Sequence, residues 1–185
     1  MAVTPQVDVR DAAAVSAVVA AGLRDVPDFP QPGVVFKDVT PLLADPHAFA
    51  VVVASLAARH EGEVDHVAGV EARGFILAAP VALALGCGFV PVRKAGKLPR
   101  ETHAVSYALE YGEATLEMHR DAVAPGERVL LVDDVLATGG TVAATIRLIE
   151  ECGAVPVAVS VLMELGFLDG RKAAGTLPVH SLATI

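Results

Sequence analysis

The chain has 185 residues, of which 54% are hydrophobic and 19% charged, so it can bury the core of one domain and is not a disordered chain. Its formal net charge of −8 argues against nucleic-acid or anionic-membrane partners, because both require a positive surface. Cys87 and Cys152 have no metal-type spacing and are too few for a disulfide scaffold, so we expect two buried thiols in a cytoplasmic protein.

The first predicted element is a helix over residues 11–23. Acidic rather than basic residues precede its apolar stretch, which argues against a signal peptide. The segment DFPQPG, residues 28–33, is rich in helix and strand breakers and is expected to be irregular. Asp45 and Pro46 suit the N-cap and first position of a second helix, which is predicted to run to about residue 60.

Strands and helices then alternate along the chain. A short apolar strand, HVAGVE, is followed by a helix over residues 74–85, a turn at Gly86 and a second strand, FVPVR. Residues 75–92 carry no charge over a length close to a membrane span, but their prolines and glycines favour a buried helix, turn and strand. The basic segment 94–104 is predicted to be a mobile loop.

The second half continues this alternation. SYALEY and ATLEMHR are predicted to form a hairpin around Gly112, and RVLLVDD is a continuous apolar strand of the kind that is covered on both faces. A helix over residues 140–152 ends at Gly153, and VPVAVSVL is a further buried strand. The pattern predicts an α/β fold, with one domain over residues 1–185 and a mainly parallel twisted sheet flanked by helices.

Charged residues gather where these predicted strands end. Glu71, Arg93 and the Asp133–Asp134 pair follow three different strands, at the edge where parallel sheets bind ligands. Residues 93–100 hold four of the chain's 14 lysines and arginines, which either clamp a small polyanion or form an ordinary solvated run. The turn at residues 70–75, VEARGF, either offers N–H groups to a phosphate or simply starts a helix.

The segment VLLVDDVLATGGT, residues 129–141, carries the most specific signal. Two glycines, two threonine hydroxyls and the start of a helix together suit a phosphate, because they present several donors and a positive dipole end. The two carboxylates suit sugar hydroxyls or Mg²⁺. The alternative is that one of them caps the helix, although capping needs only one acceptor near the first turn.

These motifs resemble the phosphoribosyl-diphosphate (PRPP) signature of type I phosphoribosyltransferases. DFPQPGVVFKDVTPLL, GVEARGF, PVRKAGKLPRET and LEYGEATLEMHRDAVAPGERVLLVDDVLATGGT narrow the similarity to adenine phosphoribosyltransferases over roughly residues 20–170. The resemblance implies the type I phosphoribosyltransferase fold, with a small N-terminal base-binding hood at residues 24–44. It also implies the reaction of adenine with PRPP to give AMP and pyrophosphate, a step of purine salvage.

The resemblance also implies roles for individual residues around PRPP. The ribose hydroxyls and 5′-phosphate would be bound by residues of the signature segment, namely Asp133, Asp134, Ala137, Thr138, Gly139, Gly140 and Thr141. The pyrophosphate would be bound by Glu71, Ala72, Arg73, Arg93, Lys94 and Lys97. Mg²⁺ is the implied cofactor, and it is expected to be held mainly through PRPP, with no side chain assigned as a direct ligand.

The base and the catalytic groups are assigned in the same way. Adenine would contact Val35, Phe36, Lys37 and Leu165, and the implied catalytic residues are Glu110 and Arg73. Lys37 departs from the arginine that is common at this position of the family. If the contact with adenine is through the backbone, little changes; a planar fork contact cannot be made by lysine.

The expected partners are adenine, PRPP and a second copy of the chain in a homodimer. Two other functions remain open at the level of sequence. One is a phosphoribosyltransferase for another base, such as hypoxanthine, guanine or orotate. The other is a non-catalytic PRPP-binding regulator of transcription, which the acidic composition and the lack of an obvious DNA-binding segment disfavour.

Overall fold

The structure, a computed structural model, describes residues 7–108 and 113–185. Its core is a seven-stranded sheet in the order β5-β6-β4-β3-β7-β8-β9, in which the last five strands of this order are parallel and β5 and β6 are antiparallel. The strands are β3 (His66–Val70), β4 (Gly88–Lys94), β5 (Thr102–Ala108), β6 (Glu113–His119), β7 (Arg128–Leu136), β8 (Val155–Glu164) and β9 (Val179–Thr184). The predicted α/β fold with a mainly parallel sheet is confirmed.

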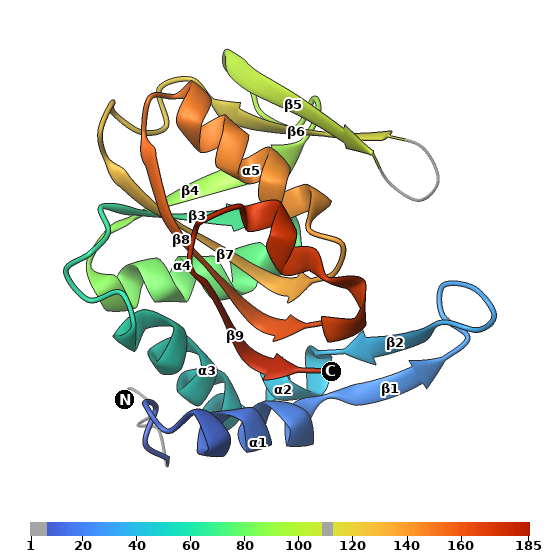
Figure 1. Cartoon of the computed structure of the whole chain (residues 1–185). Helices are drawn as coiled ribbons and strands as arrows, with labels where there is room; N and C mark the ends of the chain where they lie inside the picture. The colour runs from blue at the N-terminus through green and yellow to red at the C-terminus, as the bar shows by residue number, and fades with distance from the viewer. Residues whose placement is uncertain (1–6, 109–112) are drawn as a thin grey trace.

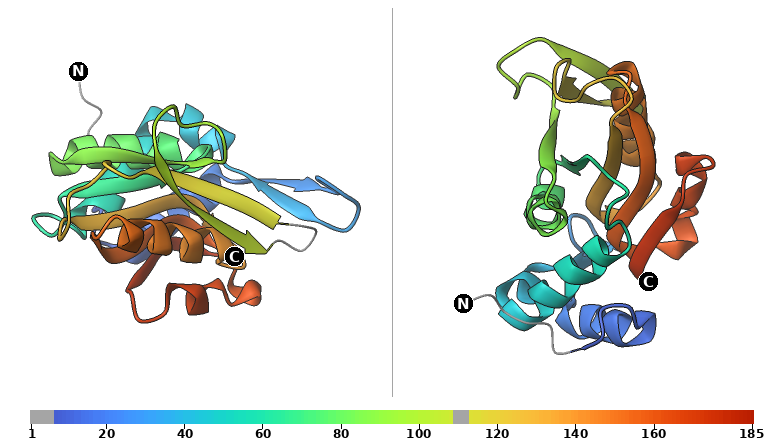
Figure 2. Two further views of the ribbon diagram at one scale, coloured as in Figure 1. Left: turned by 90° about the horizontal axis from the view of Figure 1, so that it is seen from above. Right: turned by 90° about the vertical axis from the view of Figure 1, so that its left-hand side faces the viewer.

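Helices cover both faces of this sheet (Figures 1 and 2). One face packs against α1 (Ala12–Gly22), α2 (Thr40–Ala44), α3 (Pro46–Ala58) and α4 (Arg73–Leu85). The other face packs against α5 (Gly140–Glu151) and the short 3₁₀ helix η2 (Gly170–Ala174). The central strand β7 is therefore apolar on both of its faces from Val129 to Val132, directly before Asp133.

Local sequence signals explain where the main helices begin and end. The Asp45 carboxylate accepts hydrogen bonds from the N–H groups of His47 and Ala48, at 2.8 and 3.3 Å, as expected of an N-cap. Gly86 closes α4 in the left-handed conformation, with φ at 68°. The uncharged stretch 75–92 accordingly folds as helix, turn and strand, and the described part of the chain contains no helix with the length and hydropathy of a membrane span.

The hood is a separate two-stranded sheet. β1 (Arg24–Pro27) pairs in antiparallel register with β2 (Val35–Asp38), and the hairpin projects away from the seven-stranded sheet in Figure 1. Between the strands lies the irregular DFPQPG segment, in which the N–H of Gly33 donates to the Asp28 carboxylate at 2.8 Å.

The structure corrects several expectations. The predicted loop 94–104 is shorter, because Thr102–Ala104 pair with Glu117–His119 of β6 as part of β5. β7 continues past the Asp pair, since Val135 and Leu136 still pair with β8. Cys152 is buried as expected, whereas Cys87 lies beside the Gly86 turn and is only half-buried. Strand β9 and the 3₁₀ helices η1 (Gly166–Leu168) and η2 were not predicted.

Candidate active site

The two acids of the signature segment are buried at the open end of β7. Asp133 and Asp134 are 9% and 6% exposed. The Asp133 carboxylate accepts a hydrogen bond from the N–H of Asp134 at 2.9 Å. Asp134 Oδ2 lies 2.7 Å from Arg73 Nε in an ion pair, but it accepts no hydrogen bond from any described residue because the N–H is not directed at it. This oxygen is available to a ligand that carries hydroxyl groups or a cation.

The electrostatics of the pair differ from those of surface carboxylates. Burial, together with the adjacent Asp134 carboxylate, raises the pKa of Asp133 well above its usual range. The helix-capping alternative is wrong, because the N-cap of α5 is Gly139, which makes no side-chain capping bond. The fold therefore holds two acids side by side without using them to start the next helix, which costs stability unless a ligand compensates.

The loop after these acids forms a cradle of backbone donors. Gly139 has a φ of 86°, which turns the chain sharply so that α5 begins at Gly140. The first N–H groups of a helix have no partner within that helix, so they can bind an anion. Thr138 is exposed and Thr141 is half-buried at the start of the helix. The five residues predicted to bind the 5′-phosphate thus form one continuous turn.

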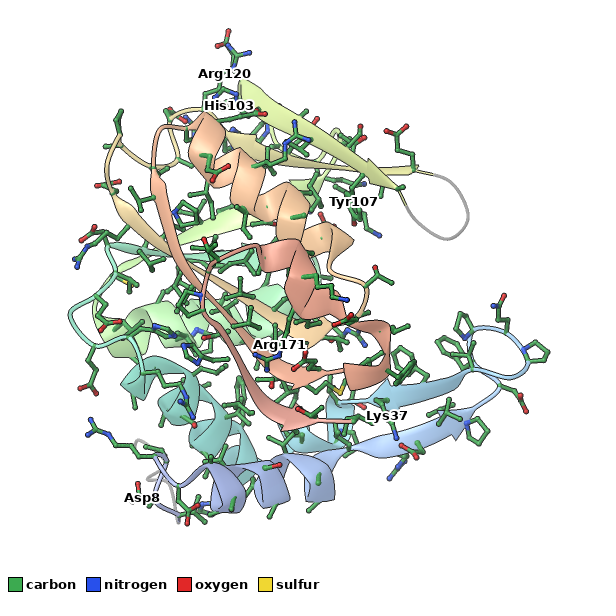
Figure 3. All side chains as sticks on the ribbon, viewed as in Figure 1. Asp8, Lys37, His103, Tyr107, Arg120 and Arg171 are labelled. Atoms are coloured by element: carbon green, nitrogen blue, oxygen red, sulfur yellow. The ribbon has the colours of Figure 1, made fainter. Side chains whose placement is uncertain are left out.

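The C-terminal segment supports this turn from behind, which the sequence did not reveal. A Cβ on Gly170 would lie 2.1 Å from the carbonyl oxygen of Ala137, and one on Gly139 would lie 2.4 Å from the Cβ of Ala173. Arg171 fixes the segment by donating from Nε to both carboxylate oxygens of buried Glu164, at 2.7 and 2.8 Å (Figure 3). The turn and η2 are consequently so close that no methyl group fits between them at Gly139 or Gly170.

The two basic residues at the end of β4, Arg93 and Lys94, bond to Glu71 and not to the Asp pair. Arg93 donates to both oxygens of Glu71, at 3.1 and 3.4 Å, and to the carbonyl of Lys97 at 3.0 Å. The N–H of Lys94 also donates to Glu71, at 3.2 Å. The Arg93 guanidinium lowers the pKa of the Glu71 carboxyl, which therefore stays ionised.

The predicted pyrophosphate residues therefore fall into two groups. Ala72 is the exposed N-cap of α4, and Arg73, the first residue of that helix, contacts Asp134. The side chains of Lys94 and Lys97 are exposed, and no hydrogen bond or ion pair within residues 7–108 and 113–185 joins them to the Asp pair. The structure thus brings Arg73 to the acids and leaves the lysines at the rim.

A small cavity of about 140 Å³ opens between the hood and the sheet. All four residues predicted to bind adenine line it, together with Arg73, which was predicted for the pyrophosphate, and with Val34, Val135 and Met163, which were not predicted. Val135 and Met163 are paired in register on β7 and β8 and form its floor. Val135 and Met163 were missed because they are strand positions whose apolar side chains could not be distinguished from core residues by pattern alone.

Phe36 and Arg73 connect this cavity with the Asp pair. The Phe36 ring packs edge-on against Phe29 at 5.2 Å between centroids, and the Arg73 guanidinium carbon lies 5.2 Å from the Phe36 centroid. Because the same guanidinium pairs with Asp134, one side chain contacts both halves of the site. A cavity lined with apolar groups thus lies next to buried carboxylates, as a substrate with a flat ring and a polar sugar requires.

The predicted roles of Lys37 and Glu110 stay predictions for different reasons. The Lys37 ammonium bonds to Asp25, its cross-strand partner in the hood, at 2.7 Å (Figure 3). The ammonium charge of Lys37 is therefore paired with Asp25 within the hood. A contact of Lys37 with adenine through the backbone stays a prediction. Glu110 lies outside the described residues, so its predicted catalytic role also stays a prediction.

The comparisons with known proteins identify the family of the chain. A family model described as "Phosphoribosyl transferase domain" matches residues 42–184. The adenine phosphoribosyltransferase of Nocardioides sp. is 68% identical over 168 residues, which are 88% of this chain and 91% of the relative. That of Thermobifida fusca is 60% identical over 172 residues, which are 92% of this chain and 98% of the relative.

Solved structures give the same result. The adenine phosphoribosyltransferase from Rhodothermus marinus has a TM-score of 0.88 at 48% identity, over 94% of this chain and 99% of that one. The enzyme from Saccharomyces cerevisiae, solved with an imino-altritol bisphosphate and adenine, has a TM-score of 0.88 at 38% identity, over 92% and 99% of the two chains. With the sequence relatives, these similarities establish that the chain belongs to the adenine phosphoribosyltransferase family.

Proposed function

We propose that this chain transfers the 5-phosphoribosyl group of PRPP to adenine, giving AMP and pyrophosphate in purine salvage. One observation supports this most strongly: the buried Asp pair and the turn at residues 137–141 lie next to an apolar cavity, with Arg73 touching both. A nucleobase and a sugar phosphate fill these two adjacent environments, and family membership agrees with that substrate pair.

Within this proposal, PRPP lies along the carboxyl edge of the sheet. The ribose hydroxyls donate to Asp133 and Asp134, and the 5′-phosphate accepts from the N–H groups and hydroxyls of residues 137–141. The pyrophosphate is placed over the turn at Glu71–Arg73, with Arg93, Lys94 and Lys97 at its outer side. Two acids next to a polyanion are unfavourable alone, which is why sugar hydroxyls or a cation belong between them.

Mg²⁺ is the cofactor that this chemistry implies, and the residues present fit it. Hard divalent cations prefer oxygen ligands, and Asp134 Oδ2 is a buried carboxylate oxygen without a hydrogen bond from any described residue. We expect the ion to be held mainly by oxygens of PRPP, with Asp133 and Asp134 as the nearest protein carboxylates. Its role is to offset the charge that develops on the leaving pyrophosphate.

The protein's own residues position the reactants and stabilise charge. The bond between the anomeric carbon and pyrophosphate breaks, the ring passes through an oxocarbenium-like state, and a ring nitrogen of adenine forms the new bond from the opposite face. Arg73 stabilises the departing pyrophosphate, for which it leaves its pair with Asp134. The proton released by adenine is assigned to Glu110, whose neighbours in the chain are Leu109 and Tyr111.

A homodimer and a cytoplasmic location complete the proposal. Ile76 and Leu83 are 44% and 83% exposed and lie two turns apart on α4, and Phe89 on β4 is 36% exposed. Arg93 shares its face of β4 with Phe89, four residues before it. A second copy that covers these apolar groups would bring Arg93 close to the active site of the other copy. Sedimentation of the wild type and of Leu83→Glu tests whether a dimer forms through these groups.

A base panel tests the proposed reaction directly. The protein is incubated with labelled PRPP, Mg²⁺ and adenine, hypoxanthine, guanine or orotate, and the nucleotide formed is identified. We expect AMP with adenine and no product with the other bases. Product with another base would replace the substrate, and PRPP binding without turnover would favour the regulator.

A further inference from the structure

Tyr107 joins the β5–β6 hairpin to the phosphate turn, although no sequence motif assigned it a role. Its hydroxyl lies 3.1 Å from Thr141 Oγ1, which is 34 residues away in the chain and belongs to the first turn of α5. Its ring packs against Gly140, where an added Cβ would be 2.8 Å from Cδ2 of the ring. Figure 3 shows Tyr107 between the hairpin and this end of α5.

Packing explains the ring of Tyr107 but not its hydroxyl. The side chain is half-buried against the apolar cluster beneath α5, where a phenylalanine ring would pack equally well. A tyrosine hydroxyl in such a place generally has a hydrogen-bond partner, and here the partner is a residue already assigned to the 5′-phosphate. Core packing alone therefore does not account for the position of the hydroxyl.

The direction of the hydrogen bond follows from what a phosphate accepts. Phosphate oxygens are acceptors, so Thr141 must donate its one hydroxyl proton to them. The same oxygen can then only accept from Tyr107, which makes the phenol the donor. Hydrogen bonds in such a chain polarise one another, so the Tyr107 proton strengthens the Thr141 donor.

We propose that Tyr107 is a positioning residue for PRPP: its hydroxyl orients Thr141 so that the threonine proton points at the 5′-phosphate. This inference rests on the proposed placement of that phosphate at residues 137–141. Tyr107 itself touches neither the sugar nor the reacting atoms. It also ties the far antiparallel edge of the sheet to the phosphate turn, since β5 is the terminal strand in the sheet order.

The test begins with Tyr107→Phe, which keeps the ring against Gly140 and removes only the hydroxyl. We expect the KM for PRPP and its dissociation constant, measured by calorimetry with Mg²⁺ and without adenine, to rise about two- to tenfold, as for one net hydrogen bond. The KM for adenine should stay within twofold. Ser106→Ala is the matched control, because the exposed Ser106 hydroxyl pairs with Thr115 at 2.8 Å on the same hairpin, and it should change neither value.

A double-mutant cycle with Thr141→Ala then separates the inference from the proposal that it rests on. If Tyr107 acts through Thr141, the double variant binds PRPP no more weakly than Thr141→Ala. In Thr141→Ser, which keeps the hydroxyl, adding Tyr107→Phe still weakens PRPP binding. If Thr141→Ala leaves PRPP affinity unchanged, the phosphate placement fails and the inference fails with it. If Thr141→Ala weakens binding while Tyr107→Phe does not, or if the two losses add fully, only the role of Tyr107 is overturned.

Discussion

The two halves of the proposed site are built in contrasting ways. The Asp pair lies on β7, the phosphate turn follows this strand directly, and β7 has β3 and β8 as neighbours within the seven-stranded sheet. The hood consists of two four-residue strands that, among the described strands, pair only with each other. The sugar-phosphate side therefore belongs to the core, whereas the base side is a projecting hairpin (Figure 1).

This difference follows the chemistry that each half performs. Two buried carboxylates repel each other and resist desolvation, so only a well-packed strand keeps them together. An apolar cavity for a flat ring needs no such constraint, and a two-stranded hairpin suffices although it is barely stable alone. We therefore expect changes on β7 to affect PRPP strongly and changes in the hood to affect adenine more weakly.

The largest expected effect comes from Asp134→Asn, which removes one charge from the Asp pair on β7. A hydrogen bond to a charged group contributes about 1.5–3 kcal/mol, so kcat/KM for PRPP should fall roughly ten- to a hundredfold. Steady-state kinetics with varied PRPP measures this. Asp121→Asn, which alters an exposed ion pair with Arg100, is the control. Kinetics equal to those of the wild type would remove Asp134 from the site.

The second test concerns the stability of the core as the pH falls. His60 is 2% exposed, bonds to Ser160 of β8 at 2.9 Å, and has its pKa lowered by burial to about 4 from the usual 6.5. Below pH 6.5 the unfolded chain takes up a proton that the folded chain refuses, so stability is lost as the pH falls toward 4.

We expect His60 to account for about 2 kcal/mol of the decrease in unfolding free energy between pH 7 and pH 5. Urea unfolding of His60→Gln at pH 7 and pH 5 should show a decrease in unfolding free energy that is smaller by that amount. His47→Gln, at an exposed position, should show the same decrease as the wild type. An equal decrease in wild type and His60→Gln would contradict the assignment.

Phe36→Ala probes the hood and should act on only one substrate. Loss of the ring removes its proposed aromatic contact with adenine, about 0.5–1.5 kcal/mol, and also its contacts with Phe29 and Arg73, so the KM for adenine should rise by up to about tenfold. The KM for PRPP should remain within twofold of the wild-type value. A larger change for PRPP than for adenine would mean that the hood and β7 are not separate in function.

The smallest effect is expected for Lys37→Met. The ion pair with Asp25 is partly exposed, and such pairs contribute about 0.2–1 kcal/mol, so kcat/KM for adenine should change by less than about fivefold. Lys37→Arg, which keeps the charge, should be closer still to the wild type. A loss of a hundredfold in Lys37→Met would show that the ammonium contacts the base.

The sequence predicted the parts of the molecule that depend on local patterns. The continuous apolar run ending at Asp133, the N-cap at Asp45 and the glycine turn at Gly139 each indicate one local structure, and all three are found. The base-binding residues of the hood came from the resemblance. Their cavity is present, whereas its floor at Val135 and Met163 looks like core in any single sequence.

The missed features depend on contacts between distant residues. Arg93 pairs with Glu71, which lies 22 residues earlier in the chain, and no periodicity reveals such a pair. Helix η2 is too short to show a hydrophobic period, and its role comes from contact of Gly170 with residue 137. Tyr107 was likewise hidden, since a single tyrosine in a strand usually means packing.

The contact between Gly170 and the carbonyl of Ala137 also limits how this enzyme can be redesigned. Neither segment can gain a methyl group unless the other retreats, so a variant library for altered sugars must change both segments together. The hood is less constrained at Val35, which is 54% exposed, although Gly33 there has a φ of 87° that disfavours any side chain. Directed evolution toward unnatural nucleobases should therefore succeed through single steps in the hood, while new sugars should demand coordinated pairs.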